Sequence, residues 1–267
     1  MFDDIEIDGV SVGNVEYHTF DTTGEHIIKY TLKDKTSIGN YAFQSCTSLT
    51  SVTIPDNITS IGERAFNYCS ILTNITIPNG VTIIDNEVFS QCYSLRSVTI
   101  PNGVTSINYG AFDECRNLAS VTIPNSVTTI GNYAFNTCSS LTSISIPDSV
   151  TSIGSEAFKY CSRLTSVTIG NGVTSIDDHA FEECMGLTNL IIGSGVTSIG
   201  IQAFNYCSSL MSITIEATTP PTLMGYSSLY NTNNCPIYVP SQSVEAYKTA
   251  DIWKDDYASR IQAIPTT

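Results

Sequence analysis

Hydrophobic residues recur along most of this chain at a fixed step of 23 positions. Between positions 38 and 215, isoleucine, phenylalanine, cysteine and leucine each return at that step without an insertion or a deletion. The four columns run from Ile38 to Ile199, from Phe43 to Phe204, from Cys46 to Cys207 and from Leu49 to Leu210. Four residue types in register over eight units indicate an internal repeat, which has to be recognised before a fold is assigned.

The hydrophobic period changes within one unit, which reads I-G-x-x-A-F-x-x-C-x-x-L-x-S-V-T-I-P-x-x-V-T-S. Residues 65–69 place apolar side chains at i, i+1 and i+4, which predicts one face of a short helix. Residues 72–77 follow the spacing L-x-x-L-x-L and end in strict alternation, which predicts a strand. Proline after the strand ends its pairing because proline has no N–H to donate. A second brief extended segment is predicted at residues 81–84.

A single unit buries too little apolar surface to fold alone, so the units must stack and share one continuous core. Each strand is then expected to pair in parallel with its equivalent one coil away, at about 4.8 Å. The pattern therefore predicts an α/β solenoid over residues 38–223, built from eight 23-residue coils with parallel strands and short helices.

The repeat motifs resemble a known family. The spacing L-x-x-L-x-L is similar to that of leucine-rich repeats, and I-G-x-x-A-F-x-x-C-x-x-L with V-T-I-P-x-x-V-T-S-I resembles the BspA-like, Treponema-type subfamily. The resemblance covers Ile38 to about Leu223. It implies a protein that is surface-attached or secreted, as in oral and gut anaerobes and some mucosal protists, where several members are linked to adhesion to host matrix proteins or to other bacteria.

The two ends do not follow the repeat, and both are expected to cap the open ends of the stack. Residues 1–37 predict a β-hairpin in which the segments 10–20 and 26–32 flank the turn signal Asp21-Thr-Thr-Gly. The phrase F-D-T-T-G-E-H-I-I-K-Y-T-L resembles the last hairpin of bacterial immunoglobulin-like surface modules, so a remnant of such a module is a second interpretation.

Residues 224–267 predict a small α/β cap. A short strand is expected at 236–240 and a helix that begins after Ser241 or Ser243, with Trp253, Tyr257 and Ile261 as an apolar plug. The stretch C-P-I-Y-V-P-x-x-S-V-E-A-Y-K-x-A-x-x-W resembles the C-terminal module common in the family. No membrane or sorting segment follows it, so we expect the chain to end naturally here.

Composition narrows the possible partners. Only 13% of the 267 residues are charged, so Ser, Thr and Asn must form most of the polar surface, and the net charge of −14 argues against nucleic acid and anionic membranes. The sequence contains no run of 18 apolar residues, so no membrane span is predicted. The first residues, MFDDIEIDG, lack the features of a signal peptide. An extracellular or cell-surface location is nevertheless expected from the resemblance, so the true N-terminus stays open.

Eight of the nine cysteines form one column of the repeat, and none lies in a C-x-x-C pair that would indicate zinc. In stacked coils their Cβ vectors would be parallel and point at the core, so we expect reduced, buried thiols that pack as small hydrophobic residues. Cys235, near the end, is expected to be buried as well. The central members of this structural ladder are Cys69, Cys92, Cys115, Cys138, Cys161 and Cys184.

No catalytic, cofactor or metal site is predicted. His18, His26 and His179 share no unit with a nucleophile and an orienting acid, and no G-x-S-x-G, P-loop or G-x-G-x-x-G occurs. The acidic pairs, such as Asp177-Asp178, lack the loop of a calcium site and are interpreted as a solvated surface.

Two surfaces are candidates for binding. On the strand face, outward residues would form a flat, uncharged ladder, although Thr also recurs simply as a good strand former. These strand-face rungs are Asn74, Thr76, Ser97, Thr99, Ser120, Thr122, Ser143, Ser166, Thr168 and Asn189. The predicted helix side varies most between units, as free variation at unconstrained positions would also produce. Its exposed tyrosines are Tyr68, Tyr133, Tyr160 and Tyr206.

The sequence thus predicts a non-enzymatic protein, monomeric in solution, that mediates adhesion or protein–protein interaction through its extended repeat surface. The expected partner is a protein or a neutral glycan: a host matrix protein, a mucin-type glycan or another microbe. Avidity over many weak contacts would supply the affinity. Two alternatives remain, a passive spacer or stalk that presents another domain, and a receptor-binding or decoration module of a virion.

Overall fold

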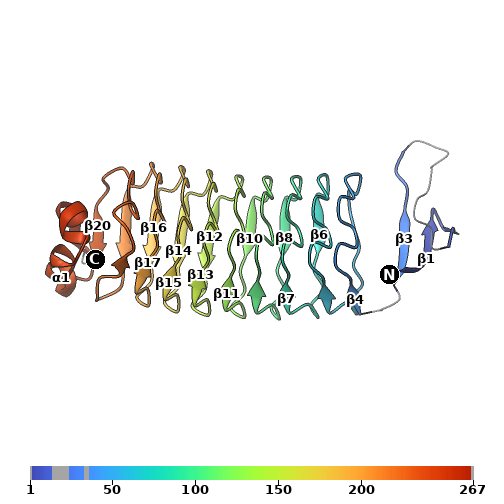
Figure 1. Cartoon of the computed structure of the whole chain (residues 1–267), viewed down its shortest axis with the longest axis horizontal. Coiled ribbons are helices and arrows are strands. Elements are labelled where there is room, and N and C mark those ends of the chain that lie inside the picture. The colour runs from blue at the N-terminus through green and yellow to red at the C-terminus, as the bar shows by residue number, and fades with distance from the viewer. Residues whose placement is uncertain (1, 14–23, 33–35, 266–267) are drawn as a thin grey trace.

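A computed structural model of the chain describes residues 2–13, 24–32 and 36–265. It confirms the predicted fold class: the coils stack along one axis into an elongated solenoid (Figure 1). The stack has about 10 turns rather than eight, because the C-terminal region adds strands to the same sheet. A small N-terminal sheet lies at one end of the stack and helix α1 (Val244–Thr249) at the other.

The predicted strand is present in every unit after the first, which makes only an isolated bridge from Ser51 to Asn74, and it pairs in parallel with its equivalent in the next coil except between β10 and β12. The register follows the repeat, as in Ser143 opposite Ser166 and Ile144 opposite Val167. A three-stranded sheet contains β6 (Asn74–Thr76), β8 (Ser97–Thr99) and β10 (Ser120–Thr122). A six-stranded sheet contains β12 (Ser143–Ile146), β14 (Ser166–Ile169), β16 (Asn189–Ile192), β18 (Ser212–Ile215), β20 (Ile237–Val239) and β21 (Ile261–Ala263).

The second extended segment of each unit is also confirmed. It forms two-residue strands: β4 (Ser37–Ile38) with β5 (Ser60–Ile61), and a seven-stranded sheet of β7 (Ile83–Ile84), β9 (Ser106–Ile107), β11 (Thr129–Ile130), β13 (Ser152–Ile153), β15 (Ser175–Ile176), β17 (Ser198–Ile199) and β19 (Thr222–Leu223). The threonine before most of these strands bonds coil to coil, as from Thr151 Oγ1 to the Thr128 carbonyl at 3.2 Å. This role explains why V-T-S recurs.

The predicted short helix of each unit is wrong. In its place the backbone makes consecutive β-turns, in which alternate N–H groups bond three residues back, as from Ala65 to the Gly62 carbonyl at 3.1 Å. The intervening N–H groups bond to the next coil, as from Arg64 to the Asn86 carbonyl at 3.0 Å. An α-helix would keep all these donors inside the unit. We call these segments the turn arcs: residues 39–47 and the equivalent nine residues of each later coil, up to 200–208.

The bonds between coils have a direction. Inside the turn arcs, alternate N–H groups donate to carbonyls of the following coil, as from Tyr133 to Ser155 (2.9 Å) and from Phe135 to Ala157 (2.8 Å). Beside the strands and at the first residue of each arc the direction reverses, as from the Thr128 N–H to the Thr105 carbonyl (2.9 Å) and from the Gly131 N–H to the Ile107 carbonyl (2.8 Å). Each coil is thus held on both sides by backbone bonds of opposite sense.

The core consists of columns that repeat the sequence pattern. Consecutive phenylalanine rings from Phe43 to Phe204 stack with centroids 5.0–5.8 Å apart and interplanar angles of 4–19°. The six predicted ladder cysteines are buried, and Cys235 is buried too. Each ladder thiol lies against the previous coil, as with Cys138 Sγ and the Phe112 carbonyl at 3.3 Å. Burial raises the pKa of Cys161 to about 12, so this group stays protonated near neutral pH.

The N-terminal region is an antiparallel sheet of order β2-β1-β3. Its strands are β1 (Phe2–Ile7), β2 (Val10–Ser11) and β3 (Ile28–Leu32). The predicted segment 26–32 contains β3, whereas the central strand β1 was not predicted. Residues 14–20, with His18, and the first residues of the predicted turn at Asp21 lie outside the described residues. Tyr30 joins this sheet to the stack by packing edge-on against Phe43, at 5.1 Å between centroids.

The C-terminal region contains the expected strand and plug. The strand predicted at 236–240 is β20, and Trp253, Tyr257 and Ile261 are buried. Around α1 lie the 3-10 turn η1 (Ser241–Ser243), the π-helical turn η2 (Trp253–Tyr257) and the 3-10 turn η3 (Ala258–Arg260). Trp253 Nε1 donates to the Pro221 carbonyl at 2.8 Å, which fixes the plug. β20 and β21 also lengthen the repeat sheet, at a step of 24 residues from Ile213 to Ile237 and Ile261.

Candidate functional site

The strand-face rungs lie on the outer side of β6–β16. Nine of the ten are exposed and Ser166 is half-buried, while the apolar residues between them face the core. Successive coils therefore present hydroxyl and amide groups at a spacing of about 4.8 Å. This arrangement offers hydrogen-bond donors and acceptors over a long surface without a charge.

The ladder on this face is interrupted between β10 and β12, which belong to different sheets. A hollow of about 540 Å³ lies across the interruption, and Val121 is half-exposed there although its equivalents Val98 and Ile144 are buried. We call this hollow the strand-face groove. Its lining includes Thr122, Asn125, Ser143, Ser145, Asp148 and Thr168.

The strand-face groove brings together three of the predicted rungs, Thr122, Ser143 and Thr168, and leaves the other seven outside. Its polar side chains carry hydroxyls, one amide and the single carboxylate of Asp148. Asp148 Oδ1 accepts from the Asn171 N–H at 2.6 Å, so it is held by the backbone of the next coil. The groove can hydrogen-bond a neutral polar ligand, and it contains no pairing of a nucleophile with a base.

The four predicted tyrosines lie in the turn arcs, at positions with left-handed backbone. Two residues of each arc have φ between 51° and 60°, where a side chain costs about 1–2 kcal/mol relative to the right-handed form. Such positions ordinarily take glycine or asparagine. Here they hold Tyr41, Arg64, Glu87, Gly110, Tyr133, Glu156, His179 and Gln202, and Ser45, Tyr68, Gln91, Glu114, Thr137, Tyr160, Glu183 and Tyr206.

A polar column beside the phenylalanine stack was not predicted. The residue after each phenylalanine is polar in every unit, and in the structure its side chain is partly or fully buried in most coils. Asn136 Nδ2 donates to Asp113 Oδ1 at 2.8 Å, and Lys159 Nζ lies 3.0 Å from Glu182 Oε2. The signal in the sequence was an invariably polar position next to a core residue. The column is Gln44, Asn67, Ser90, Asp113, Asn136, Lys159, Glu182 and Asn205.

Two carboxylates of this column have shifted pKa values of opposite sign. Desolvation raises the pKa of Asp113 to about 6, although the hydrogen bond from Asn136 opposes it. Desolvation also acts on Glu182, but bonds from Lys159, His179 and Asn205 outweigh it and lower the pKa of Glu182. His179 is therefore occupied by Glu182, at 2.9 Å, rather than poised as a base for a substrate.

We expect Asp113→Asn to stabilise the protein at pH 7.5 and not at pH 4. A folded pKa of about 6, above the ordinary aspartate pKa of 3.8, means that the folded state binds the extra proton between these values. Stability is then greatest below pH 4 and falls as the pH rises through 6. The full shift corresponds to about 3 kcal/mol, which partial solvent exposure reduces to about 1–2 kcal/mol. Urea unfolding at both pH values measures the gain.

The matched control for this experiment is Glu216→Gln, which makes the same change on an exposed side chain. Its effect should be within about 0.5 kcal/mol at both pH values. An equal gain from Asp113→Asn at pH 4 and pH 7.5 would contradict the assignment, because the charge would then not be its source.

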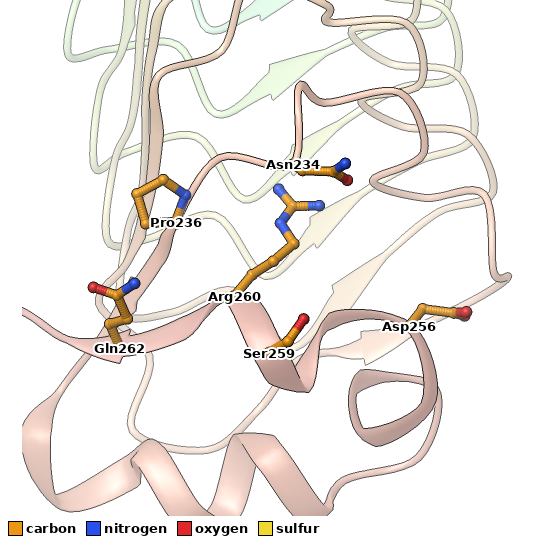
Figure 2. A pocket seen from close by; sticks show the side chains of 6 residues that line it. All are labelled: Asn234, Pro236, Asp256, Ser259, Arg260 and Gln262. Atoms are coloured by element: carbon orange, nitrogen blue, oxygen red, sulfur yellow. The ribbon is translucent and has the colours of Figure 1, made fainter.

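A second hollow, of about 480 Å³, lies in the C-terminal region between β20, η2, η3 and β21 (Figure 2). Arg260 occupies its centre in the view, with Nε bonded to the Cys235 carbonyl at 2.7 Å and Nη2 to Thr232 Oγ1 at 2.9 Å. These bonds tie η3 to the loop before β20. Arg260 thus has a role in holding the cap together.

The remaining chemistry-bearing residues do not converge. In the described ranges, no group of three or more His, Cys, Asp or Glu side chains is arranged to hold a metal ion. His26 Nδ1 lies 2.7 Å from Asp8 Oδ2 in the N-terminal sheet, far along the chain from His179. No helix in the described part of the chain is both long and apolar enough to cross a membrane.

Comparisons with known proteins place the chain in a family. The model of the BspA type leucine rich repeat region matches residues 14–142 and 128–250. A solved leucine-rich repeat protein from Bacteroides ovatus ATCC 8483 is 30% identical over 82% of this chain and 61% of that one, with a TM-score of 0.60. This chain therefore spans about three fifths of that structure. No match was found among curated proteins.

Two further solved structures resemble the chain. The T. pallidum leucine-rich repeat protein is 30% identical, covering 66% of this chain and 71% of that one, with a TM-score of 0.47. A leucine-rich cell surface protein from Faecalibacterium prausnitzii A2-165 is 25% identical, covering 89% and 88%, with a TM-score of 0.43. With its 23-residue units matched over most of their length, the chain belongs to the BspA-type leucine-rich repeat family.

Proposed function

We propose that this chain is a non-catalytic adhesion protein that acts outside the cell and binds a protein or a neutral glycan through its strand face. The observation that carries the proposal is the strand-face groove, a hollow on the strand face whose lining combines hydroxyl groups with apolar side chains and one carboxylate, Asp148. Membership of the BspA-type family supports it, since the family resemblance implies surface-attached or secreted proteins. Host matrix proteins, mucin-type glycans and surfaces of other microbes are the partner classes.

Binding would rest on many weak contacts spread along the strand-face rungs. Each rung offers one or two hydrogen bonds, which contribute only about 0.5–1.5 kcal/mol each after water is displaced. The groove adds a place where several such groups face one ligand. A single chain would act as a monomer, and several copies on one surface would raise the apparent affinity by avidity.

We expect Ser143→Arg to weaken binding at least tenfold. Ser143 lies at the interruption and is exposed, so a bulky charged side chain would fill the groove without disturbing the core. The purified chain is first screened on an array of matrix proteins and neutral glycans, and the affinity for any hit is then measured for both proteins. Thr219→Arg is the matched control, because it adds the same charge at an exposed position outside the groove.

Equal losses from Ser143→Arg and Thr219→Arg would contradict a role for the groove. A spacer is the second candidate, and the near identity of the rungs favours it, since binding sites usually rest on a few distinct aromatic or Arg anchors. No binding to any array member at high concentration would support the spacer and overturn the proposal.

A further inference from the structure

The left-handed positions of the turn arcs hold residues with side chains, although this backbone conformation favours glycine. Of the 16 positions from Tyr41 to Tyr206, only Gly110 is glycine and none is asparagine. Backbone strain that persists at a repeated position points to a use for the side chain. The buried columns do not explain it, because none of the 15 side chains at these positions is buried.

The side chains at and near these positions are mostly aromatic or acidic. Tyrosine rings pair between coils in three places along this side: Tyr68 with Tyr93 at 5.9 Å, Tyr109 with Tyr133 at 5.4 Å, and Tyr206 with Tyr230 at 6.5 Å between centroids. Tyr109 is 48% exposed and Tyr206 46%. Phenol rings at this exposure offer flat faces and a polar edge, which suits recognition.

The net charge of the repeat array lies entirely on this side. The turn arcs carry ten acidic residues and three basic ones. The rest of residues 38–215 carries two of each, Asp56 and Asp148 against Arg96 and Arg163, and is neutral overall. The three basic residues of the arcs are Arg64, Arg116 and Lys159, and each lies against an acidic side chain.

Some tyrosines of the arcs make cation–π contacts with basic side chains of the protein itself. Arg116 lies over the ring of Tyr93 with 5.0 Å to the centroid, and Lys159 over Tyr160 at 5.1 Å. The pair Tyr109–Tyr133 has no such cation among the described contacts, while Tyr133 donates its hydroxyl to Glu156 Oε1 at 2.7 Å. Glu156 also pairs with Lys159 at 3.3 Å, so the feature of this pair that attracts an ammonium or guanidinium group is its two ring faces.

We propose that the turn-arc face binds a Lys/Arg-rich segment of a partner polypeptide, with Tyr109 and Tyr133 as a principal contact. Coulomb attraction to the acidic arcs brings the segment in, and the exposed rings take its cationic side chains. This surface is separate from the strand-face groove, so the inference stands or fails independently of the proposed function.

The test measures fluorescence anisotropy of a labelled 20-residue Lys/Arg-rich peptide with the full chain, beside a Ser/Thr-rich peptide of equal length. Only the basic peptide should bind, and its affinity should fall about tenfold or more between 50 and 300 mM NaCl as the charges are screened. Tyr109→Ser and Tyr133→Gly should each weaken binding about 2–5-fold, the range of a cation–π contact at an exposed site.

Stability separates binding from packing. Tyr133→Gly removes the ring but suits the left-handed backbone (φ 59°), so the unfolding midpoint should not fall. Tyr238→Ser removes a half-buried ring from β20 and should leave peptide affinity unchanged, as should Ser143→Arg. Wild-type affinity in both turn-arc variants, binding that ignores salt, or equal binding of the Ser/Thr-rich peptide would each overturn the inference. A joint loss of affinity and stability in Tyr133→Gly would assign the tyrosine a structural role instead.

Discussion

Replacing Phe135 with alanine is expected to destabilise the protein by about 3–5 kcal/mol, the range for truncating a fully buried aromatic ring. Phe135 is 0% exposed and stacks on Phe112 and on Phe158, each at 5.2 Å and within 8° of parallel. Alanine would leave a cavity that opens the column in both directions. In a stack whose coils contact only their neighbours, this site couples the two halves.

The consequence is measured in urea with two probes. Trp253 is the single tryptophan and is buried in the C-terminal plug, so its fluorescence follows that end of the stack, while circular dichroism follows all coils. In wild type the two transitions should coincide. In Phe135→Ala they should separate, because the N-terminal and C-terminal halves lose their coupling.

Phe43→Ala is the matched control, because Phe43 belongs to the same column but stacks on only one phenylalanine, Phe66, and is 8% exposed. Its effect should be smaller, and it should not separate the two transitions. Equal destabilisation by Phe43→Ala and Phe135→Ala would show that the column does not act by coupling neighbours.

Gly172→Ala should destabilise the protein by about 1–3 kcal/mol, the usual range for overpacking at a close contact. A Cβ atom at Gly172 would overlap the carbonyl oxygen of Asp148 in the previous coil, and its carbonyl carbon at 2.9 Å. Both obstacles are backbone atoms of the turn after β12, so neither can rotate away as a side chain would. Relief would require the two coils to move apart along several hydrogen bonds.

The equivalent position three units earlier supplies the control. At Gly103 the nearest atom to an added Cβ is the Asn79 carbonyl oxygen at 3.5 Å, an ordinary contact. Gly103→Ala should therefore be neutral or stabilise by up to about 1 kcal/mol through the unfolded state. Thermal unfolding of both variants decides the matter, and similar shifts in Tm would contradict the close approach at Gly172.

The repeat and its core could be predicted from the sequence because the same apolar residue types occupy the same positions in eight successive units. A period of 23 with buried Ile, Phe, Cys and Leu columns allows only a stack, and the strand at 72–77 follows from alternation. The residue after the strand is proline in the earlier units, as at Pro147, and glycine at the equivalent Gly170. The Gly170 N–H donates to the Ile146 carbonyl at 2.9 Å, a bond to the previous coil that proline cannot make because it has no N–H.

The turn arcs could not be predicted from the same pattern. Spacing of i, i+1 and i+4 fits one helical face, but it also fits consecutive turns when the N–H groups of Arg64 and Tyr68 find partners in the next coil. A tyrosine such as Tyr68 does not predict a φ of 59°, because glycine is the residue that ordinarily adopts this backbone conformation. Inter-coil bonds outweighed the local preference.

The ends and the candidate site were predicted only in part. β1 was missed because FDDIEI is short and acidic, and β20 and β21 were missed as coils because their step is 24 rather than 23. The rungs were identifiable as outward residues of a strand. The strand-face groove was not, because Thr122 and Ser145 in the groove occupy the same slot as Thr76 and Thr99 outside it. The units have nearly the same sequence, and only the interruption between β10 and β12 distinguishes them.

The opposite sense of the backbone bonds on the two sides of each coil has a consequence for the electrostatics of the whole rod. In an α-helix all peptide dipoles add, and partial charge accumulates at both ends. Here alternate N–H groups of the turn arcs point toward one end of the rod and those beside the strands toward the other. The two contributions offset each other coil by coil. The rod therefore has little net peptide dipole along its axis whatever its number of units, and neither end acquires the partial charge that a helix end carries.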